Sequence, residues 1–176
     1  MTEERPDDLA PLGGAMRAEW QAEESELTRA AFEQWRHARG LVDLIAECAA
    51  RGDILHLTAA TATFRGPVVE VGPDRFTIAA GPGPVDVQVG PDLVLGIDRA
   101  ANADVGDTPG LGIRFRARLL ELETAGVTVV VGTGATEVRG RLQVGSDHVV
   151  VTQAELERVV PLGAIVWVRV DEDGVR

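Results

Sequence analysis

The residues with the greatest capacity for chemistry are one cysteine and three histidines, and their spacing does not group them. His37 falls in a stretch of helical periodicity, His56 in a strand pattern and His148 beside a turn. None of them is spaced to bind a metal or to form a catalytic pair with Cys48. Structural or solvent-facing roles are therefore favoured, and Cys48 is expected to be a small core residue. We expect a chain that is not an enzyme, with no catalytic, cofactor or metal site.

Two turns of similar sequence each carry an aspartate followed by a basic residue. The segment VGPDR contains Asp74 and Arg75, and the segment VGSDH contains Asp147 and His148. An aspartate in a turn commonly accepts hydrogen bonds from nearby backbone amides, so a structural role is favoured over a binding role. The glycine-rich segments GPGP and GTGAT have no following lysine, and we interpret them as hairpin turns rather than phosphate loops.

Charge is distributed unevenly along the chain. The formal net charge is −11, and all 17 basic residues are arginines. Residues 1–112 carry 9 Arg against 19 Asp and Glu, whereas residues 113–169 carry 7 Arg against 6 acids. An acidic protein repels phosphate backbones at long range, which argues against general binding to nucleic acid or anionic membranes.

The arginines of the second half are the candidates for a local contact with an anion or a nucleic acid. These candidates are Arg114, Arg118, Arg139 and Arg141, with Arg116 and Arg158 nearby. Glutamates lie close to them in the sequence, at positions 121, 123, 137, 155 and 157. A mixed, solvated surface is therefore favoured over an anion-binding patch.

The first 50 residues are expected to contain a helical region with an apolar stripe, which precedes the strands in the sequence. Residues 1–14 are typical of a disordered tail, and residues 15–50 predict one kinked helix or a pair of helices. Trp20, Phe32 and Trp35 give this helix more apolar area than a free helix should expose. Packing on the protein's own strands is favoured, and the alternative is contact with a protein partner or a second copy.

The rest of the chain predicts two copies of a helix followed by five strands. Residues 51–100 and 113–172 each contain five short alternating segments, joined by a linker at residues 101–112. The second helix is expected over residues 111–125, capped by Asp107 or Thr108 with Pro109 at its first position. The phrase FRGPVVEVGPD recurs as VRGRLQVGSD with one residue fewer, so we expect a bulge in the second strand of the first copy.

This order, with Gly66 and Gly140 inside the second strands and a Gly-x-Asp turn before the third, resembles the Sm-like fold. The resemblance implies a mainly β chain with an N-terminal helix and two tandem five-stranded small barrels, each preceded by a helix. The alternative is another small five-stranded barrel. Two modules in one chain can pair their open strand edges with each other, so we expect a monomer or a dimer.

RNA-binding members of the Sm-like family carry an Asn three residues after the turn Asp, and an Arg-Gly pair in a later turn. Here Asp74 and Asp147 match the first position, but Thr77 and Val150 stand where the Asn would be. The segments LGIDR and VWVRV contain no Arg-Gly pair. The resemblance therefore implies a barrel whose RNA-reading residues are mostly absent.

The organisation is also similar to uncharacterised actinobacterial proteins that often carry the label Fis-family transcriptional regulator. The helical region has no basic recognition helix of the kind such a regulator would need. No secretory signal and no membrane-spanning apolar run is visible, so a cytoplasmic location is expected. We expect a non-catalytic scaffold or regulatory module that acts through protein–protein contacts. The alternative is an Sm-derived nucleic-acid binder or transcriptional regulator that uses the arginines of the second barrel.

Overall fold

The computed structural model describes residues 10–59, 62–81, 83–100 and 109–171, with no side-chain description for residues 10–19 and 22. The chain divides into two compact units, residues 1–40 and residues 41–176, and each is described by itself. No helix of the described part of the chain is both long and apolar enough to cross a membrane.

The first unit contains one long helix, α1, Ala10–Ala38. It begins five residues before the predicted start at residue 15, so residues 10–14 are helical rather than part of a tail. Pro11 is tolerated there because the first turn of a helix does not need its backbone N–H groups for intrahelical bonds. The rest of the predicted tail, residues 1–9, lies outside the described residues. The chain leaves the helical conformation at residues 39 and 40, so of the two predicted alternatives the structure has a pair of helices and not one kinked helix.

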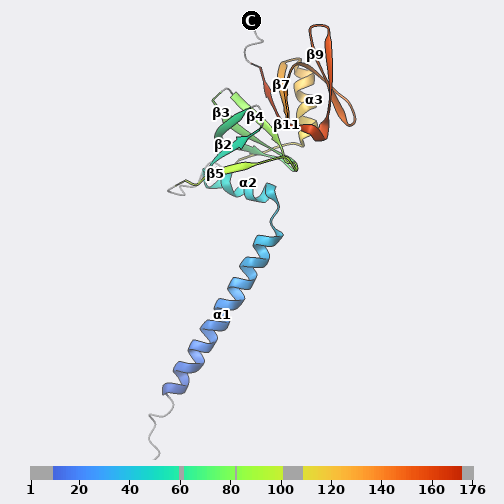
Figure 1. The fold of residues 1–176 in the computed structure, drawn as a ribbon. Helices are drawn as coiled ribbons and strands as arrows, with labels where there is room; N and C mark the ends of the chain where they lie inside the picture. Colours follow the sequence, from blue (N-terminus) through green and yellow to red (C-terminus); the bar gives the residue numbers. More distant parts are fainter. Residues whose placement is uncertain (1–9, 60–61, 82, 101–108, 172–176) are drawn as a thin grey trace, which may run out of the picture. The chain divides into compact units, whose positions relative to one another are not determined.

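The second unit is a mixed α/β structure in which mostly antiparallel strands form one large open sheet (Figure 1). Its helices and the 3-10 turn are α2 (Leu41–Ala50), α3 (Phe115–Ala125) and η2 (Leu162–Ala164). The strands of the first half are β1 (Ile54–Thr58), β2 (Thr63–Val71), β3 (Arg75–Ala80), β4 (Gly83–Gln88), β5 (Leu95–Asp98) and β6 (Gly110–Leu111). Those of the second half are β7 (Thr128–Thr133), β8 (Glu137–Val144), β9 (His148–Gln153), β10 (Leu156–Pro161) and β11 (Ile165–Val170).

The strand order is the same in both halves. The sheet runs β10-β9-β8-β7-β11-β4-β3-β2-β1-β5, so in this direction each half has its fourth, third, second, first and fifth strand in turn. The two halves join where β11 pairs with β4. Strand β6 lies off this path and pairs in parallel with β2. Among the described strands the pairing is an open path, and neither half closes into the barrel that the sequence predicts.

The bulge predicted in the second strand of the first half is confirmed. The register between β2 and β3 shifts between Val68 and Glu70, whereas β8 and β9 pair without a shift. A side chain at Gly66 would collide with the backbone carbonyl of Ala79, and one at Gly140 with that of Thr152. Glycine at both places therefore lets the third strand cross closely over the second.

Two apolar cores lie in this unit, one in each half. The first joins α2 to β1–β4 and includes Trp167 of β11, whose ring meets Phe64 edge-on at 4.7 Å. The second joins α3 to β7–β11 through residues such as Leu119, Leu122 and Val149. Because strand β11 contributes to both cores, the halves are packed together and not only linked by the chain.

Helix α3 begins four residues later than the sequence predicts. Its first residue is Phe115, and residues 110 and 111 form β6 instead. The predicted caps Asp107 and Thr108 lie outside the described residues. The backbone N–H of Phe115 is bound by the side chain of Asp74, from a turn of the first half. This start is set by a tertiary contact, which a local capping pattern does not reveal.

Candidate functional site

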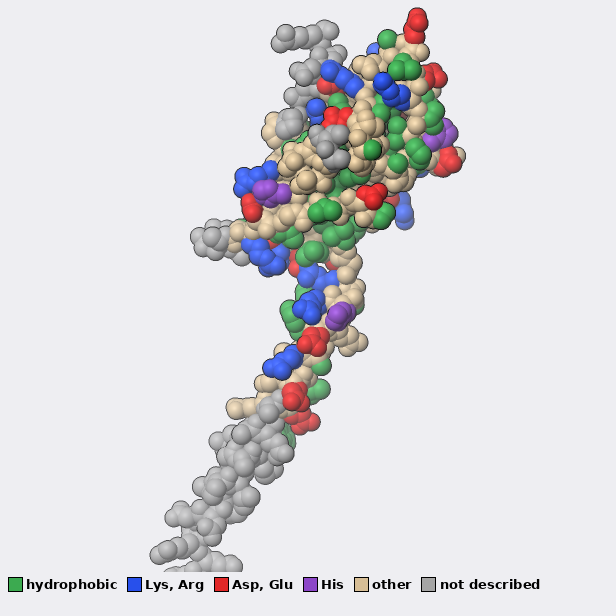
Figure 2. Space-filling view, viewed as in Figure 1, with side chains coloured by type: hydrophobic (Ala, Val, Ile, Leu, Met, Phe, Trp, Pro, Cys, Tyr) green, Lys and Arg blue, Asp and Glu red, His purple; other side chains and the backbone are tan. Residues whose placement is uncertain are grey.

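The predicted partner-binding residues lie on α1 and are exposed to solvent. Trp20 is 71% exposed, Phe32 58% and Trp35 48%, and Leu27 on the same helix is 67% exposed. The rings of Phe32 and Trp35 lie 5.7 Å apart, and the guanidinium of Arg39 stands 4.6 Å from the Trp35 ring centre. Figure 2 shows apolar side chains standing among charged ones along this helix. This surface offers aromatic area of the kind that anchors protein contacts.

The two arginine candidates at α3 differ in their surroundings. Arg114 is the exposed N-cap residue of the helix. The Nε of Arg118 donates to Asp86 at 2.8 Å, and its Nη1 donates to Glu121 at 2.9 Å. Burial opposes the charge of Arg118, but these two carboxylates outweigh it and raise the pKa of the guanidinium. Arg118 is therefore already neutralised by acids and is a poor anion site.

The two candidates on β8 line a shared groove. Arg139 and Arg141 are exposed on the same face of the strand, and with Thr152 they border a hollow of about 360 Å³. Arg139 is also ion-paired with Asp171, which is buried. Because Val138 and Leu142 point into the core that α3 joins, the β8 arginines lie on the opposite face from it. The four predicted arginines thus do not form one patch.

The ion pair of Arg139 has a counterpart in the first half. Arg65 stands at the repeat-equivalent position of β2 and donates to Asp98 at 3.0 Å. His56 also approaches Asp98, at 2.7 Å. These contacts, His56 first and Arg65 second, lower the pKa of Asp98. An arginine on the second strand paired with an aspartate at the end of the fifth strand (Asp98) or directly after it (Asp171) is thus a feature of the repeat, which favours a structural role for Arg139.

The two repeat-equivalent turns use their aspartates differently. The carbonyl of Asp74 accepts from Val89 N at 2.9 Å, and that of Asp147 accepts from Leu162 N at 2.8 Å. The Asp74 carboxylate also binds the first backbone N–H of α3, at 2.7 Å. The Asp147 carboxylate is 86% exposed, and its contact with His148 at 2.8 Å lowers its pKa. The first turn is therefore a helix cap, whereas the second presents its carboxylate to solvent.

A buried ionic cluster that the sequence did not indicate lies beside the first of these turns. Arg75 is 2% exposed, and its Nη1 donates to Asp86 Oδ1 and to Thr77 Oγ1, both at 2.8 Å. Its Nε donates to the carbonyl of Ile113 at 2.8 Å, and its Nη2 is ion-paired with Glu70. The cluster therefore ties β2, β3 and β4 to the segment that leads into α3. Its only sequence signal is the acid Asp86 between two apolar residues of a strand.

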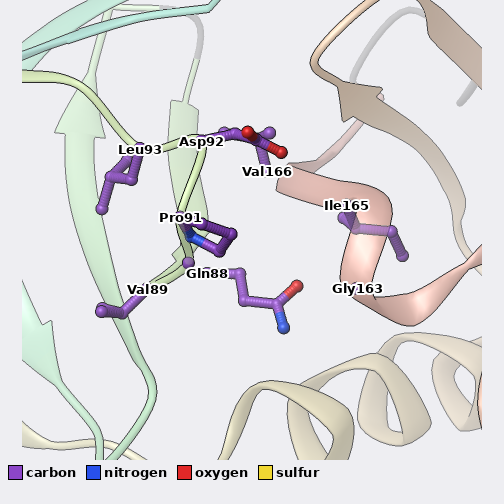
Figure 3. Close-up of a pocket in the computed structure, with 9 residues that line it drawn as sticks. Gln88, Val89, Pro91, Asp92, Leu93, Gly163, Ile165 and Val166 are labelled. Atoms are coloured by element: carbon purple, nitrogen blue, oxygen red, sulfur yellow. The ribbon is translucent and has the colours of Figure 1, made fainter.

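The inner junction, defined as the pairing of β4 with β11, completes the contact between the halves. It aligns Val85 with Arg169, Asp86 with Val168 and Val87 with Trp167. Figure 3 shows the small hollow of about 130 Å³ at one end, where Gln88 points from β4 toward η2. When the side-chain amide of Gln88 is oriented with its nitrogen, and not its oxygen, toward η2, it donates to the carbonyls of Leu162 and Ile165. The hollow is part of the packing between the halves and has no charged pair facing into it.

The single cysteine is buried next to an ion pair. Arg51 donates to Asp53 at 2.7 Å and approaches the sulfur of Cys48 at 3.5 Å. Burial and then the nearby charge of Asp53 raise the pKa of the thiol. Burial also opposes ionisation of Asp53, but hydrogen bonds from Arg51 and Ala100 outweigh it and lower the pKa of that carboxyl. Such a thiol is poorly activated for nucleophilic chemistry.

The described residues bring together no three His, Cys, Asp or Glu side chains that could hold a metal ion. No known protein-family model matches the chain, and no curated protein matches it in sequence.

Proposed function

We propose that this protein is a non-catalytic scaffold or regulatory module of the cytoplasm, acting through protein–protein contacts made by α1. The observation that carries the proposal is the exposed aromatic surface of that helix, formed by Trp20, Phe32 and Trp35. Tryptophan is enriched at the centre of protein interfaces, where it buries a large area with few rotatable bonds.

The internal repeat supports a more specific proposal for the fold of the second unit. Residues 51–100 and 113–172 are tandem Sm-like modules, each led by a helix, as the common strand order of the two halves suggests. In this proposal the paired modules are a rigid body that carries α1, and they do not read RNA, because Thr77 and Val150 replace the amide-bearing residue.

The test is affinity capture from a lysate of the source organism with and without nuclease, comparing three full-length forms. The variant Trp20→Ala/Trp35→Ala removes the two indoles, and Gln21→Ala/Gln34→Ala is a matched control on the same helix. We expect the wild type and the control to retain the same captured proteins after nuclease treatment. The tryptophan variant should retain about 10-fold less of them, or lower still. Equal retention by all three forms would refute the role of α1.

A second candidate is an Sm-derived nucleic-acid-binding protein or transcriptional regulator, in line with the Fis-family label of similar proteins. It is supported by the groove between Arg139 and Arg141. Fluorescence anisotropy with labelled single-stranded RNA and DNA tests it. Binding that weakens steeply with salt and is lost in Arg139→Ala/Arg141→Ala would favour it. The control Arg29→Ala/Arg36→Ala removes the same charge from α1, and an equal effect there would indicate only general electrostatics.

A further inference from the structure

The apolar face of α1 keeps to one side of the helix and mixes large with small side chains. It is formed by Trp20, Leu27, Ala31, Trp35 and Ala38, all of which are exposed. From the first to the last of them the chain makes five turns of 3.6 residues, so they stay on one face of a straight helix. Such a face fits a second helix whose small residues lie opposite its large ones.

This face is complementary to itself when two copies of α1 run antiparallel and cross at residue 29. Trp20 of one copy then lies opposite Ala38 of the other, and Leu27 lies opposite Ala31. Because the arrangement has a two-fold axis, each of these contacts occurs twice. In this register every large residue of the face except Trp35 has an alanine opposite it.

Trp35 lies opposite a hollow instead of a small residue. This hollow of about 430 Å³ lies on α1 beside Trp20, Glu23, Glu24 and Leu27. Four residues with these spacings form the kind of hole that receives one side chain of a facing helix. Residue 35 of one copy lies opposite residue 23 of the other, so the indole of Trp35 enters this hole.

The charges along α1 favour the same orientation. Residues 20–28 carry three glutamates and no basic residue, whereas residues 29–39 carry three arginines and one glutamate. Antiparallel pairing places the acidic part of each helix beside the basic part of the other, and parallel pairing would place like charges together. The guanidinium of Arg39 stands 4.6 Å from the centre of the Trp35 ring, so it accompanies that ring toward Glu23.

We propose that α1 binds a second copy of this chain as an antiparallel pair of helices, with Trp35 of each copy in the hole of the other. Burial of an aromatic side chain covers about 150–250 Å². With two tryptophans, Leu27 and the flanking side chains of each helix, the interface buries a total of roughly 1,200 Å², the lower limit for specific complexes. We therefore expect a dimer that dissociates on dilution. This inference rests on the proposed role of α1 as a contact surface and names the partner.

Sedimentation equilibrium of the full chain, over a range of concentrations, tests whether the dimer forms. The wild type is expected to rise from the 18.7 kDa of one chain to twice that mass. The variant Trp20→Ala/Trp35→Ala removes the inserted indole and one wall of its hole, so it should weaken dimerisation by about 30-fold or more. A tryptophan variant that dimerises like the wild type would overturn the proposal.

Charge reversal tests the complementarity between the two parts of α1. Glu23→Arg/Glu24→Arg makes both parts basic, and Arg36→Glu/Arg39→Glu makes both parts acidic. Each variant alone should dimerise about 10-fold more weakly, because like charges then face each other. An equimolar mixture of the two should recover dimers of wild-type strength, and a mixture that stays monomeric would contradict the register.

The matched controls lie in the second unit. Leu111→Ala/Leu120→Ala removes exposed apolar side chains there, and Glu155→Arg/Glu157→Arg reverses two exposed charges. Both should dimerise like the wild type. A loss in these controls as large as that in the α1 variants would count against an interface made by α1.

The distance between two spin labels, one on each copy at Gln21→Cys, tests the orientation. Crossing at residue 29 sets the labelled positions about 24 Å apart along the helices, at about 1.5 Å per residue. A parallel pair would bring them to roughly the 8–10 Å that separates packed helices. Cys48 is 0% exposed, so the label attaches at position 21 of the native protein. The short distance would overturn the antiparallel arrangement.

The failure of this inference and that of the proposed function can be told apart. A wild type that stays at the mass of one chain overturns the inference. If lysate capture still depends on the tryptophans in that case, the proposed function stands and α1 binds a different protein. A wild type that dimerises as described but captures no other protein supports the inference and refutes the scaffold role.

Discussion

The buried carboxylate of Asp86 should contribute more to stability than any exposed charge of this protein. It accepts three hydrogen bonds, from Arg75 at 2.8 Å, Thr77 at 2.7 Å and Arg118 at 2.8 Å. In Asp86→Ala the buried guanidinium of Arg75 keeps its ion pair with Glu70 but loses its ion pair with Asp86, the buried one of its two carboxylate partners. Removing one partner of a buried pair costs about 3–5 kcal/mol, because the other charge stays in the interior. Since Arg75 keeps one acid, we expect about 3 kcal/mol, the lower end of that range.

The assay is urea denaturation of the full chain, followed by circular dichroism of the strands. Glu121→Ala is the matched control, since it breaks only the half-exposed ion pair with Arg118 and should cost less than about 1 kcal/mol. In the double variant Asp86→Ala/Arg118→Ala, the second change should add little, because Arg118 has already lost its buried partner. If Asp86→Ala cost no more than the control, the ionic cluster would not hold the halves together as we argue.

Three further outcomes follow from other contacts. Gly132→Ala should lower the thermal midpoint, with a cost of about 1–3 kcal/mol, because the new methyl group would overlap the ring of Trp167, whereas Gly134→Ala meets open space and should be neutral. The lowered pKa of Asp53 stabilises the fold above its unfolded pKa of about 3.9, and this stabilisation is lost as pH falls through the folded value. Asp53→Asn should therefore flatten the acid side of a plot of unfolding free energy against pH, and an unchanged slope would count against the ion pair. Cys48 should react with a thiol reagent in a colorimetric assay only after denaturation, and rapid labelling of the native protein would contradict its burial.

The five strands of each half could be predicted approximately, because alternation of apolar residues and turn signals marked them. Strand β6 was not predicted, since Gly110 and Leu111 lie in residues expected to be a linker and the start of a helix. The bulge followed from a change in the spacing between the repeated phrases, which placed it in the second strand of the first copy, and the structure locates it between Val68 and Glu70. The open path of strands did not follow, because which edges pair depends on contacts between the halves. The same holds for the start of α3, since Asp74 lies 41 residues before the amide that it binds.

The candidate site was predictable only in part. The exposed tryptophans of α1 were recognisable as an apolar stripe. Nothing in the sequence distinguishes a buried arginine from an exposed one. Arg75 follows a turn, where an exposed side chain is expected, yet it is 2% exposed. Nor could the sequence show that Arg118 and Arg139 are each ion-paired with an acid from another element. The distribution of charge along the chain was therefore a poor guide to free positive surface.

The place of β11 in the sheet has a consequence for biosynthesis. It follows every other strand of the sheet in the chain, yet it lies in the middle, between β7 and β4. A nascent chain can pair β1 to β5 as the first half leaves the ribosome, but the edge of β4 and the ring of Phe64 stay uncovered until β11 has been made. Until then, a neighbouring nascent chain on the same messenger RNA could offer a competing strand. Ribosome stalling or premature termination before Ile165 would therefore leave both halves incomplete, not just the second.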